Sequence, residues 1–358
     1  MDLTTPSLVI EADQMERNLR DMQQFADKTG VKLRPHSKAH KVPKLATKQI
    51  EYGADGICVQ KISEALVMVE NGVTNVFVSN VVVSPEKLDI FADLSSKAQM
   101  SICVDSEIGI NRLAEAAIRK GEELNCLVEV DCGLHRCGVD PERAGDLSKL
   151  VSGKKNLVFR GMTAYEGHIP NYPKDQWPNL VEQAMAIVSS AKRAIESRGL
   201  KCDDVIVGGT STAKISGKYP DVTEITPGGY LFYDEELVDS GLVGLEKCSL
   251  SVLCTVVSRQ QDDRVILDGG IKTFDIDQGK FPRPKDPSLN LEFLYLNEEH
   301  AVLKLKDSET KRKMQIGTKW EFIPYLVSTC VNLHDFLFLQ KEGKIVEVLK
   351  VLARGKVW

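Results

Sequence analysis

Hydrophobic and polar residues follow two alternating patterns along the first two thirds of the chain. Met15, Leu19, Met22 and Phe25 recur at the spacing of one helical face, and Gly30 follows where such a helix would end. Further helical patterns, the longest over 176–199, are separated by short runs rich in β-branched and apolar residues, which predict strands. These runs are 31–36, 57–59, 76–79, 102–105, 127–131, 159–165 and 205–208.

The regular alternation of strand and helix predicts βαβ units and therefore a parallel sheet. Seven or eight such units match a (β/α)₈ barrel better than an open doubly wound sheet. Neither a Walker A sequence nor a strand–GxGxxG–helix sequence occurs, which weakens the nucleotide-binding alternatives. After about residue 239 the pattern changes to short β-rich runs with weak helical stripes between them. These runs are 248–257, 264–268, 301–305, 322–327 and 336–339. We predict an α/β protein with a barrel domain over 5–238 and a mostly-β domain over 239–358.

Composition and charge narrow the function classes. The chain has 358 residues, 42% hydrophobic and 27% charged, with a net charge of −5, so nothing points to nucleic acid or to an anionic membrane surface. No apolar run approaches the ~20 residues of a membrane span, and the N-terminus lacks the pattern of a signal peptide. The nine cysteines show no CxxC or zinc spacing, which is typical of reduced thiols. We expect a cytoplasmic protein that acts on a small molecule.

One segment concentrates reactive side chains. Residues 34–41 (RPHSKAHK) contain two histidines and three cations at the C-terminal end of the first predicted barrel strand. In a (β/α)₈ barrel this end of the strands faces the active site. A lysine flanked there by other cations has a depressed pKa, which favours Schiff-base chemistry. Composition alone leaves open that the segment is a solvated basic loop after a strand.

This segment resembles the cofactor-lysine motif of the D-threonine aldolase and D-serine dehydratase family, in the alanine racemase-like group of pyridoxal phosphate enzymes. The resemblance implies that Lys38 holds pyridoxal 5'-phosphate through a Schiff base. Residues 130–139 (VDCGLHRCGV) resemble the family loop whose arginine, here Arg136, hydrogen-bonds the phenolic oxygen of the cofactor. Residues 165–168 (YEGH) resemble the motif whose aromatic residue, here Tyr165, lies against the pyridine ring. Each motif alone is weak, since Tyr165 could belong to the core and Arg136 to a surface ion pair, but they follow one another on successive strand ends.

Two glycine-rich stretches, 208–212 (GGTST) and 226–230 (TPGGY), resemble the phosphate-holding loops of the family. Glycine lets backbone N–H groups approach a phosphate, and hydroxyl groups add further donors. Thr226 occupies the position where related racemases place an arginine near the pyridine nitrogen, and a neutral partner would not force a proton onto that nitrogen. The cofactor residues that the resemblance implies in these two loops are Thr210, Ser211, Thr226, Gly228, Gly229 and Tyr230.

The chain departs from the family at its metal site. Aldolases and dehydratases of the family hold a metal through a histidine and through a cysteine or aspartate two residues later. Pro324 and the string 331–333 (VNL) align this region without a gap, and the two ligand positions hold Leu326 and Ser328. Leucine cannot bind a metal and neutral serine is a poor ligand, so we expect no metal. A rebuilt site is the alternative, and it would draw on Cys330, His334 and Asp335.

The resemblance implies a pyridoxal phosphate-dependent lyase of the aldolase type, acting on a D- or β-hydroxy amino acid. Lys38 would pass the cofactor to the substrate amine, and His36 and His40 are the expected acid or base at the β-position. Loss of the metal disfavours a dehydratase most, an aldolase less and a racemase not at all. A racemase or epimerase is therefore the alternative, and a cofactor-binding protein without turnover is disfavoured by the ~120 residues of the β domain. The family further implies a homodimer, while the substrate side chain and its stereochemistry stay open.

Overall fold

The computed structural model describes residues 3–276 and 279–358. The first two residues of the N-terminus, which was compared above with a signal peptide, lie outside the described residues. The chain forms two compact units that interleave along the sequence. Unit 1 comprises Met1–Leu19, Ala39–Val42 and Gly229–Gly355, and unit 2 comprises Arg20–Lys38, Pro43–Gly228 and Lys356–Trp358.

Unit 2 contains a curled sheet of eight parallel strands in the order β2-β9-β8-β7-β6-β5-β4-β3. The strands are β2 (Lys32–Leu33), β3 (Ile57–Val59), β4 (Asn75–Val78), β5 (Gln99–Val104), β6 (Leu124–Val130), β7 (Leu157–Ala164), β8 (Asp204–Val207) and β9 (Glu224–Ile225). One inward residue from each of five strands packs in the interior: Cys58, Phe77, Cys103, Leu127 and Ile206. Burial raises the pKa of Cys58 to about 12, so this thiol stays protonated and packs as a small apolar group.

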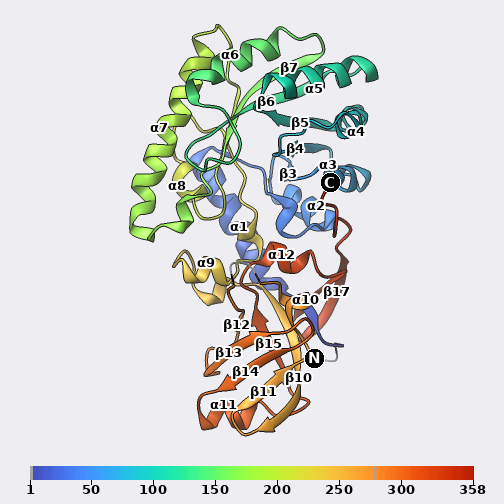
Figure 1. Cartoon of the computed structure of the whole chain (residues 1–358), viewed down its shortest axis with the longest axis vertical. Helices are drawn as coiled ribbons and strands as arrows, with labels where there is room; N and C mark the ends of the chain where they lie inside the picture. The colour runs from blue at the N-terminus through green and yellow to red at the C-terminus, as the bar shows by residue number, and fades with distance from the viewer. Residues whose placement is uncertain (1–2, 277–278) are drawn as a thin grey trace. The chain divides into compact units, whose positions relative to one another are not determined.

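Helices follow the strands and run along the outside of this sheet (Figure 1). They are α1 (Ala12–Thr29), which begins in unit 1, and α2 (Pro43–Glu51), α3 (Ile62–Glu70), α4 (Pro85–Ser95), α5 (Glu107–Lys120), α6 (Pro141–Ser152), α7 (Trp177–Glu196) and α8 (Ala213–Ser216). Local sequence explains their ends: α4 begins at a proline, and α5 has Ser106 accepting a hydrogen bond from the Gly109 N–H and Gly121 in the left-handed conformation after its last residue.

Residues 34–37 close the ring between the two edge strands, β2 and β3. The Asp55 N–H donates to the Leu33 carbonyl at 2.8 Å, and the Cys58 N–H donates to the Pro35 carbonyl at 2.9 Å. His36 and Cys58 form an isolated parallel bridge. Lys38 follows this closure within two residues, on the short 3-10 helix η1 (Ser37–Ala39), so its backbone is fixed by both edges of the barrel.

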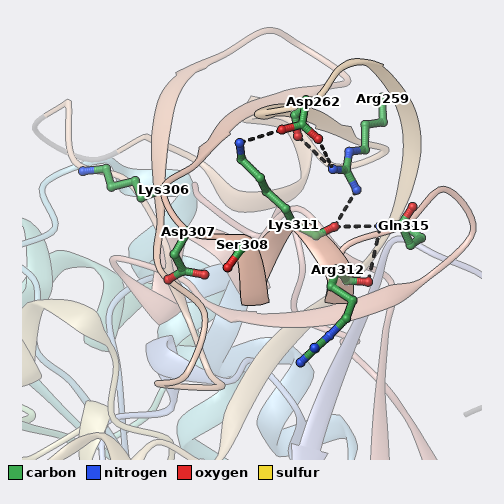
Figure 2. A pocket seen from close by; sticks show the side chains of 8 residues that line it. All are labelled: Arg259, Asp262, Lys306, Asp307, Ser308, Lys311, Arg312 and Gln315. Carbon is green, nitrogen blue, oxygen red and sulfur yellow. Dashed lines mark hydrogen bonds and ion pairs between the residues drawn. The ribbon is translucent and has the colours of Figure 1, made fainter.

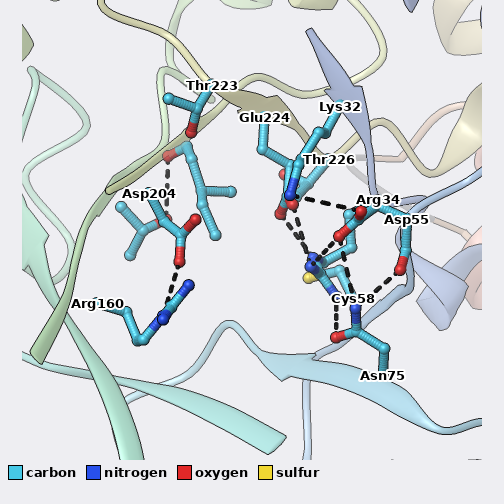
Figure 3. Close-up of polar contacts among 12 residues, drawn as sticks. Lys32, Arg34, Asp55, Cys58, Asn75, Arg160, Asp204, Thr223, Glu224 and Thr226 are labelled. Carbon is cyan, nitrogen blue, oxygen red and sulfur yellow. Dashed lines mark hydrogen bonds and ion pairs between the residues drawn. The ribbon is translucent and has the colours of Figure 1, made fainter. Parts of the chain in front are cut away.

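A buried ion cluster supports the same closure (Figure 3). The Arg34 guanidinium donates to both oxygens of Glu224, at 2.6 and 3.1 Å, and also to Asn75 at 2.7 Å and Asp55 at 3.0 Å. Arg34 and Glu224 are both buried, at 7% and 4% exposure. Because these partners come from the starts of β3, β4 and β9 and from the end of β2, the cluster ties four strands together around one side chain.

Unit 1 contains a nine-stranded mixed sheet. Its main path runs β13-β14-β11-β10-β1-β16-β17, while β15 pairs with β10 and β12 pairs with β15. The strands are β1 (Ser7–Glu11), β10 (Leu250–Gln261), β11 (Arg264–Leu267), β12 (Arg283–Pro284), β13 (Leu291–Leu296), β14 (Ala301–Leu305), β15 (Lys319–Ile323), β16 (Phe336–Lys341) and β17 (Lys344–Lys350). Strand β1 lies antiparallel to β10 and parallel to β16. Short helices α9 (Glu235–Asp239), α10 (Ile271–Phe274), α11 (Ser308–Lys313) and α12 (Val327–Val331) connect the strands.

The structure confirms the predicted fold class, a parallel-stranded barrel with helices and a separate, mostly-strand sheet. One predicted strand, 322–327, is wrong in its second half, because β15 ends before Pro324 and helix α12 begins at Val327. Within residues 3–276 and 279–358, no helix is long and apolar enough to cross a membrane.

Candidate active site

Lys38 lies in surroundings that favour its neutral amine. Burial lowers the pKa of Lys38, Cys58 opposes this effect, and the positive charge of Arg136 lowers the pKa further. The Nζ atom lies 5.9 Å from the centre of the Tyr165 ring. A neutral amine is the nucleophilic form of lysine, so the environment suits a Schiff-base lysine.

Residues from three other predicted motifs lie next to the ring of Tyr165. The Arg136 Cζ lies 5.5 Å from the ring centre, on the same ring that Lys38 approaches. A Cβ on Gly167 would lie 2.2 Å from the ring, so this position needs glycine, and a Cβ on Gly209 would be in tight contact with the ring at 3.0 Å. Tyr165 keeps 36% exposure, which separates it from the buried core. Lys38, Arg136 and the first glycine-rich loop thus meet at one aromatic face.

The first glycine-rich loop offers unused hydrogen-bond donors. The Gly208 N–H donates to Glu166 at 3.1 Å, and the Gly209 N–H donates to the Thr212 hydroxyl at 3.3 Å. In the part of the chain that the structure describes, the backbone N–H groups and hydroxyls of Thr210 and Ser211 have no hydrogen-bond partner. Four free donors on two adjacent residues fit a phosphate group.

The second glycine-rich loop begins beside the first. The Thr226 hydroxyl donates to the Gly208 carbonyl at 2.9 Å, which ties the end of β9 to the first loop. Gly228 is the last residue of this stretch in unit 2, whereas Gly229 and Tyr230 belong to unit 1, on the 3-10 helix η4 (Gly229–Leu231). Thr226 therefore joins the group around Tyr165, and the cofactor roles of Gly228, Gly229 and Tyr230 stay predictions.

The two histidines predicted as acid or base are both engaged by neighbouring groups. His36 Nδ1 accepts the Lys38 backbone N–H at 3.3 Å, and its Nε2 lies 3.2 Å from both the Gln60 Oε1 and the Ser79 hydroxyl. His40 belongs to unit 1, is fully buried, and accepts the Val42 N–H on Nδ1 at 3.0 Å. Only His36 is thus placed beside Lys38 by the contacts within unit 2.

Three ionisable residues of unit 2 were not predicted. Glu129, near the end of β6, is buried and accepts a hydrogen bond from the Cys103 thiol at 3.3 Å, and burial raises the pKa of this carboxyl. Glu166 is fully buried, and its Oε1 has no partner among the described residues. His168 has a buried Nδ1 that likewise lacks a described partner, and burial lowers its pKa. Glu166 and His168 lie within the motif 165–168, whereas Glu129 is one acidic residue inside the apolar run of β6, which gives no local signal of a function.

The segment aligned with the metal site of the family is built around backbone contacts. Leu326 precedes helix α12, and the next N–H, of Val327, donates to the buried Asp234 carboxyl at 3.0 Å. His334 and Cys330 both contact the Thr273 carbonyl, at 2.8 and 3.2 Å, and Asp335 pairs with Arg354. Leu326 and Ser328 provide no adequate donor pair, so these residues do not fit the metal of the family.

A polar pocket in unit 1 is a weaker candidate (Figure 2). It is lined by Arg259, Lys311 and Asp262 among others, and these three charges pair with one another. Arg259 also donates to the carbonyls of residues 262, 311 and 314. Because its central charges are already satisfied, the pocket lacks the reactive amine and the free donors that surround Tyr165.

Comparisons with known proteins agree with the geometry around Lys38. A family model described as the N-terminal domain of alanine racemase matches residues 10–236, and one described as a putative serine dehydratase domain matches residues 249–340. The chain is 35% identical to a D-threonine aldolase of Arthrobacter sp over 356 residues, which cover 98% of this chain and 93% of that protein. The chain belongs to the alanine racemase-like family that includes D-threonine aldolase.

Two further relatives extend this result. A 3-hydroxy-D-aspartate aldolase of Paracoccus denitrificans is 32% identical, covering 99% of this chain and 93% of that one. The crystal structure of a D-threonine aldolase from Filomicrobium marinum is 33% identical with a TM-score of 0.94, covering all of this chain and 97% of that one. The chain is accordingly a pyridoxal phosphate-dependent amino-acid lyase of this family. A buried amine, an aromatic face, a cation and four free donors in unit 2 fit this cofactor.

Proposed function

We propose that the chain cleaves the Cα–Cβ bond of a D-configured β-hydroxy amino acid, releasing an aldehyde and glycine, with the cofactor attached to Lys38. The observation that carries this proposal is the convergence of Lys38, Arg136 and Gly209 on the ring of Tyr165. The substrate class is drawn from the relatives, which are named as aldolases of D-threonine and of 3-hydroxy-D-aspartate.

Each residue around Tyr165 has a defined task in this proposal. Pyridoxal phosphate, when bound, withdraws electrons from the α-carbon of the amino acid attached to it. Lys38 would hold the cofactor, and its neutral amine can hold or return a proton at the α-carbon of the substrate. Arg136 provides positive charge for the phenolic oxygen, and the donors of Thr210 and Ser211 provide hydrogen bonds for the phosphate. Tyr165 orients the cofactor ring by packing against it.

We also propose that the β-hydroxyl proton is removed by a protein base rather than with the help of a metal. Leu326 and Ser328 stand where the family places its two ligands, and neither side chain is an adequate donor for a metal. Carbon–carbon cleavage requires only a base at the hydroxyl, whereas dehydration requires an acid strong enough to expel it. The donor set at these positions therefore favours the aldolase over the dehydratase.

A single assay separates the candidate reactions. Purified holoenzyme is incubated with D-threonine, with D-3-hydroxyaspartate and with single enantiomers of common amino acids, in metal-free buffer with a chelator. We expect aldehyde and glycine in equal amounts, at a rate that neither chelator nor added divalent metal changes more than about twofold. Release of ammonia and a keto acid would contradict the aldolase proposal in favour of a dehydratase, and loss of optical rotation without aldehyde would favour the racemase.

The predicted homodimer is tested separately. The family resemblance implies that two copies assemble, and static light scattering on the holoenzyme would give a mass near twice the 39.7 kDa of one chain. A mass that stays at one chain across concentrations would contradict the prediction.

A further inference from the structure

We propose that His36 is a positioning residue that holds Lys38 through its backbone, and that it does not exchange protons with the substrate. This inference rests on the proposed function for its activity readout, but its argument depends only on contacts within unit 2. It assigns His36 a different role from the acid or base that its place in the sequence suggests.

The hydrogen bonds around His36 determine which ring nitrogen carries the proton. Nδ1 lies 3.3 Å from the backbone nitrogen of Lys38, and because that group is an N–H donor, Nδ1 must offer its lone pair. The proton of a neutral ring is then on Nε2. Two oxygen atoms can accept this proton in a hydrogen bond, the Gln60 Oε1 and the Ser79 hydroxyl oxygen, each 3.2 Å from Nε2.

Both oxygens are themselves held as acceptors. The Gln60 side-chain amide donates to the Ser79 carbonyl at 3.2 Å, which turns Oε1 toward His36. The Ser79 hydroxyl donates its hydrogen to the Val59 carbonyl at 3.2 Å, so its oxygen faces the ring as an acceptor. The donor and acceptor roles thus agree at each of these contacts, and of the two neutral tautomers the one with the proton on Nε2 satisfies them.

Further hydrogen bonds fix the backbone on both sides of the contacts between His36, Gln60 and Ser79. Glu64, 2% exposed, accepts the backbone N–H groups of Gln60 at 2.8 Å and of Lys61 at 3.0 Å, which fixes the loop before α3. The His36 backbone N–H donates to the Pro227 carbonyl at 3.1 Å, and the Ser37 hydroxyl donates to the Cys58 carbonyl at 3.2 Å. The ring of His36 is therefore fixed by β3, β4 and the end of β9.

This arrangement conflicts with acid–base catalysis by His36. A general base must accept a proton, and the lone pair that could take it already holds the Lys38 N–H. Protonating Nδ1 would replace an acceptor with a donor facing another N–H, and would release the backbone of the lysine that carries the cofactor. Losing Nε2–H would break its contacts with Gln60 and Ser79. These contacts assign His36 an effect on the reaction through the place and reactivity of Lys38, and not through proton exchange with the substrate.

Two substitutions test the roles of the two His36 ring nitrogens, Nδ1 and Nε2, separately. His36→Asn places an amide oxygen near the position of Nδ1 and keeps an acceptor for Lys38, whereas His36→Gln places its polar end near Nε2 and loses that acceptor. The pKa of the Lys38 amine is measured in the apoprotein from the pH dependence of its acetylation, read on the Lys38 peptide by mass spectrometry. The kcat and its pH profile are measured on the holoenzyme, and circular dichroism with thermal unfolding checks that each variant is folded.

We expect His36→Asn to lower kcat less than about fivefold, with an unchanged pH profile and an unchanged Lys38 pKa. We expect His36→Gln to lower kcat about 10- to 100-fold, with the pKa of Lys38 moved toward its ordinary value, because small displacements of a reacting group have effects of this size. Equal loss of activity in both folded variants, together with loss of one limb of the pH profile, would overturn the proposal.

The acetylation measurement distinguishes this inference from the proposed function. If the wild-type holoenzyme cleaves none of the amino acids, the proposed function fails, and the reactivity of Lys38 still decides on His36. An unchanged Lys38 pKa in folded His36→Gln would then show that His36 does not position the lysine.

Discussion

The ion cluster at the closure of the barrel offers a quantitative test of the fold that supports Lys38. Arg34→Met removes a guanidinium that donates to Glu224 twice and leaves that carboxylate buried at 4% exposure. Breaking a buried ion pair by removing one partner costs about 3–5 kcal/mol, because the remaining charge is uncompensated. Replacing both partners, in Arg34→Met with Glu224→Leu, removes the uncompensated charge and should cost less than half as much.

The pH dependence of this cost carries a definite sign. Burial raises the pKa of Glu224, and Arg34 counteracts part of that rise. Without Arg34 the folded-state pKa rises further above its value in the unfolded chain, so the native state binds a proton that the unfolded state releases. Stability is then retained at low pH and lost as pH rises toward the folded-state pKa, by up to about 1.4 kcal/mol per pH unit. The destabilisation in Arg34→Met should therefore be larger at pH 8 than at pH 5.

Urea unfolding of the apoprotein, followed by circular dichroism at pH 5 and pH 8, measures these differences. Lys32→Met is the matched control, because Lys32 also pairs with Asp55, at 3.5 Å, but its side chain is 56% exposed. This control should change the free energy of unfolding by less than about 1 kcal/mol. The reasoning is refuted if Arg34→Met is no less stable than Lys32→Met, or if the double variant is less stable than Arg34→Met alone.

Three further predictions follow from the described contacts. Thr210→Ala with Ser211→Ala removes two of four free donors and should weaken pyridoxal phosphate binding about 10- to 100-fold by equilibrium dialysis, while an unchanged affinity would exclude these residues from the phosphate site. Burial raises the pKa of Asp234 to about 7, so the free energy of unfolding falls as pH rises from about 4 to 7. Asp234→Asn should remove on the order of 3–4 kcal/mol of that fall. An equal dependence of the free energy of unfolding on pH in both proteins would contradict this. Gly161 has φ +144°, and a Cβ there would lie 2.0 Å from a backbone oxygen, so Gly161→Ala should lower the free energy of unfolding in urea by more than about 2 kcal/mol. In the control Gly153→Ala the nearest atom lies 3.5 Å from the added Cβ, and the loss should be less than about 1 kcal/mol.

The sequence predicts those parts of the fold that depend on local pattern. The runs 57–59 and 301–305 coincide with β3 and β14, because apolar, β-branched residues there are bounded by turns. The helix predicted over 176–199 matches α7, Trp177–Glu196. The glycine-rich loop at 208–212 was identified because a Gly-Gly step beside hydroxyl residues is a local signal.

Features that join distant residues could not be predicted in the same way. Strands β2 and β9 are two residues long, too short for a periodic pattern, although β2 is an edge strand at which the barrel closes. Strand β1 joins β10 and β16, which lie more than 200 residues later, so its partners are set by tertiary packing.

The candidate site shows the same division. Lys38 is predicted from its local motif, but the tautomer of His36 depends on Gln60 and Ser79, 24 and 43 residues away. Arg34 and Glu224, 190 residues apart, form a pair that no local pattern reveals. Motifs therefore predict a candidate reactive group, while the residues that would position it are found only in the folded chain.

The attachment of the cofactor to Lys38 can be measured directly. The holoenzyme is reduced with borohydride, digested, and analysed by mass spectrometry for a peptide that carries the pyridoxyl phosphate group. The account predicts this group on Lys38, and loss of the visible absorbance of the cofactor in Lys38→Ala. The group on another lysine, or an unchanged absorbance in Lys38→Ala, would contradict it.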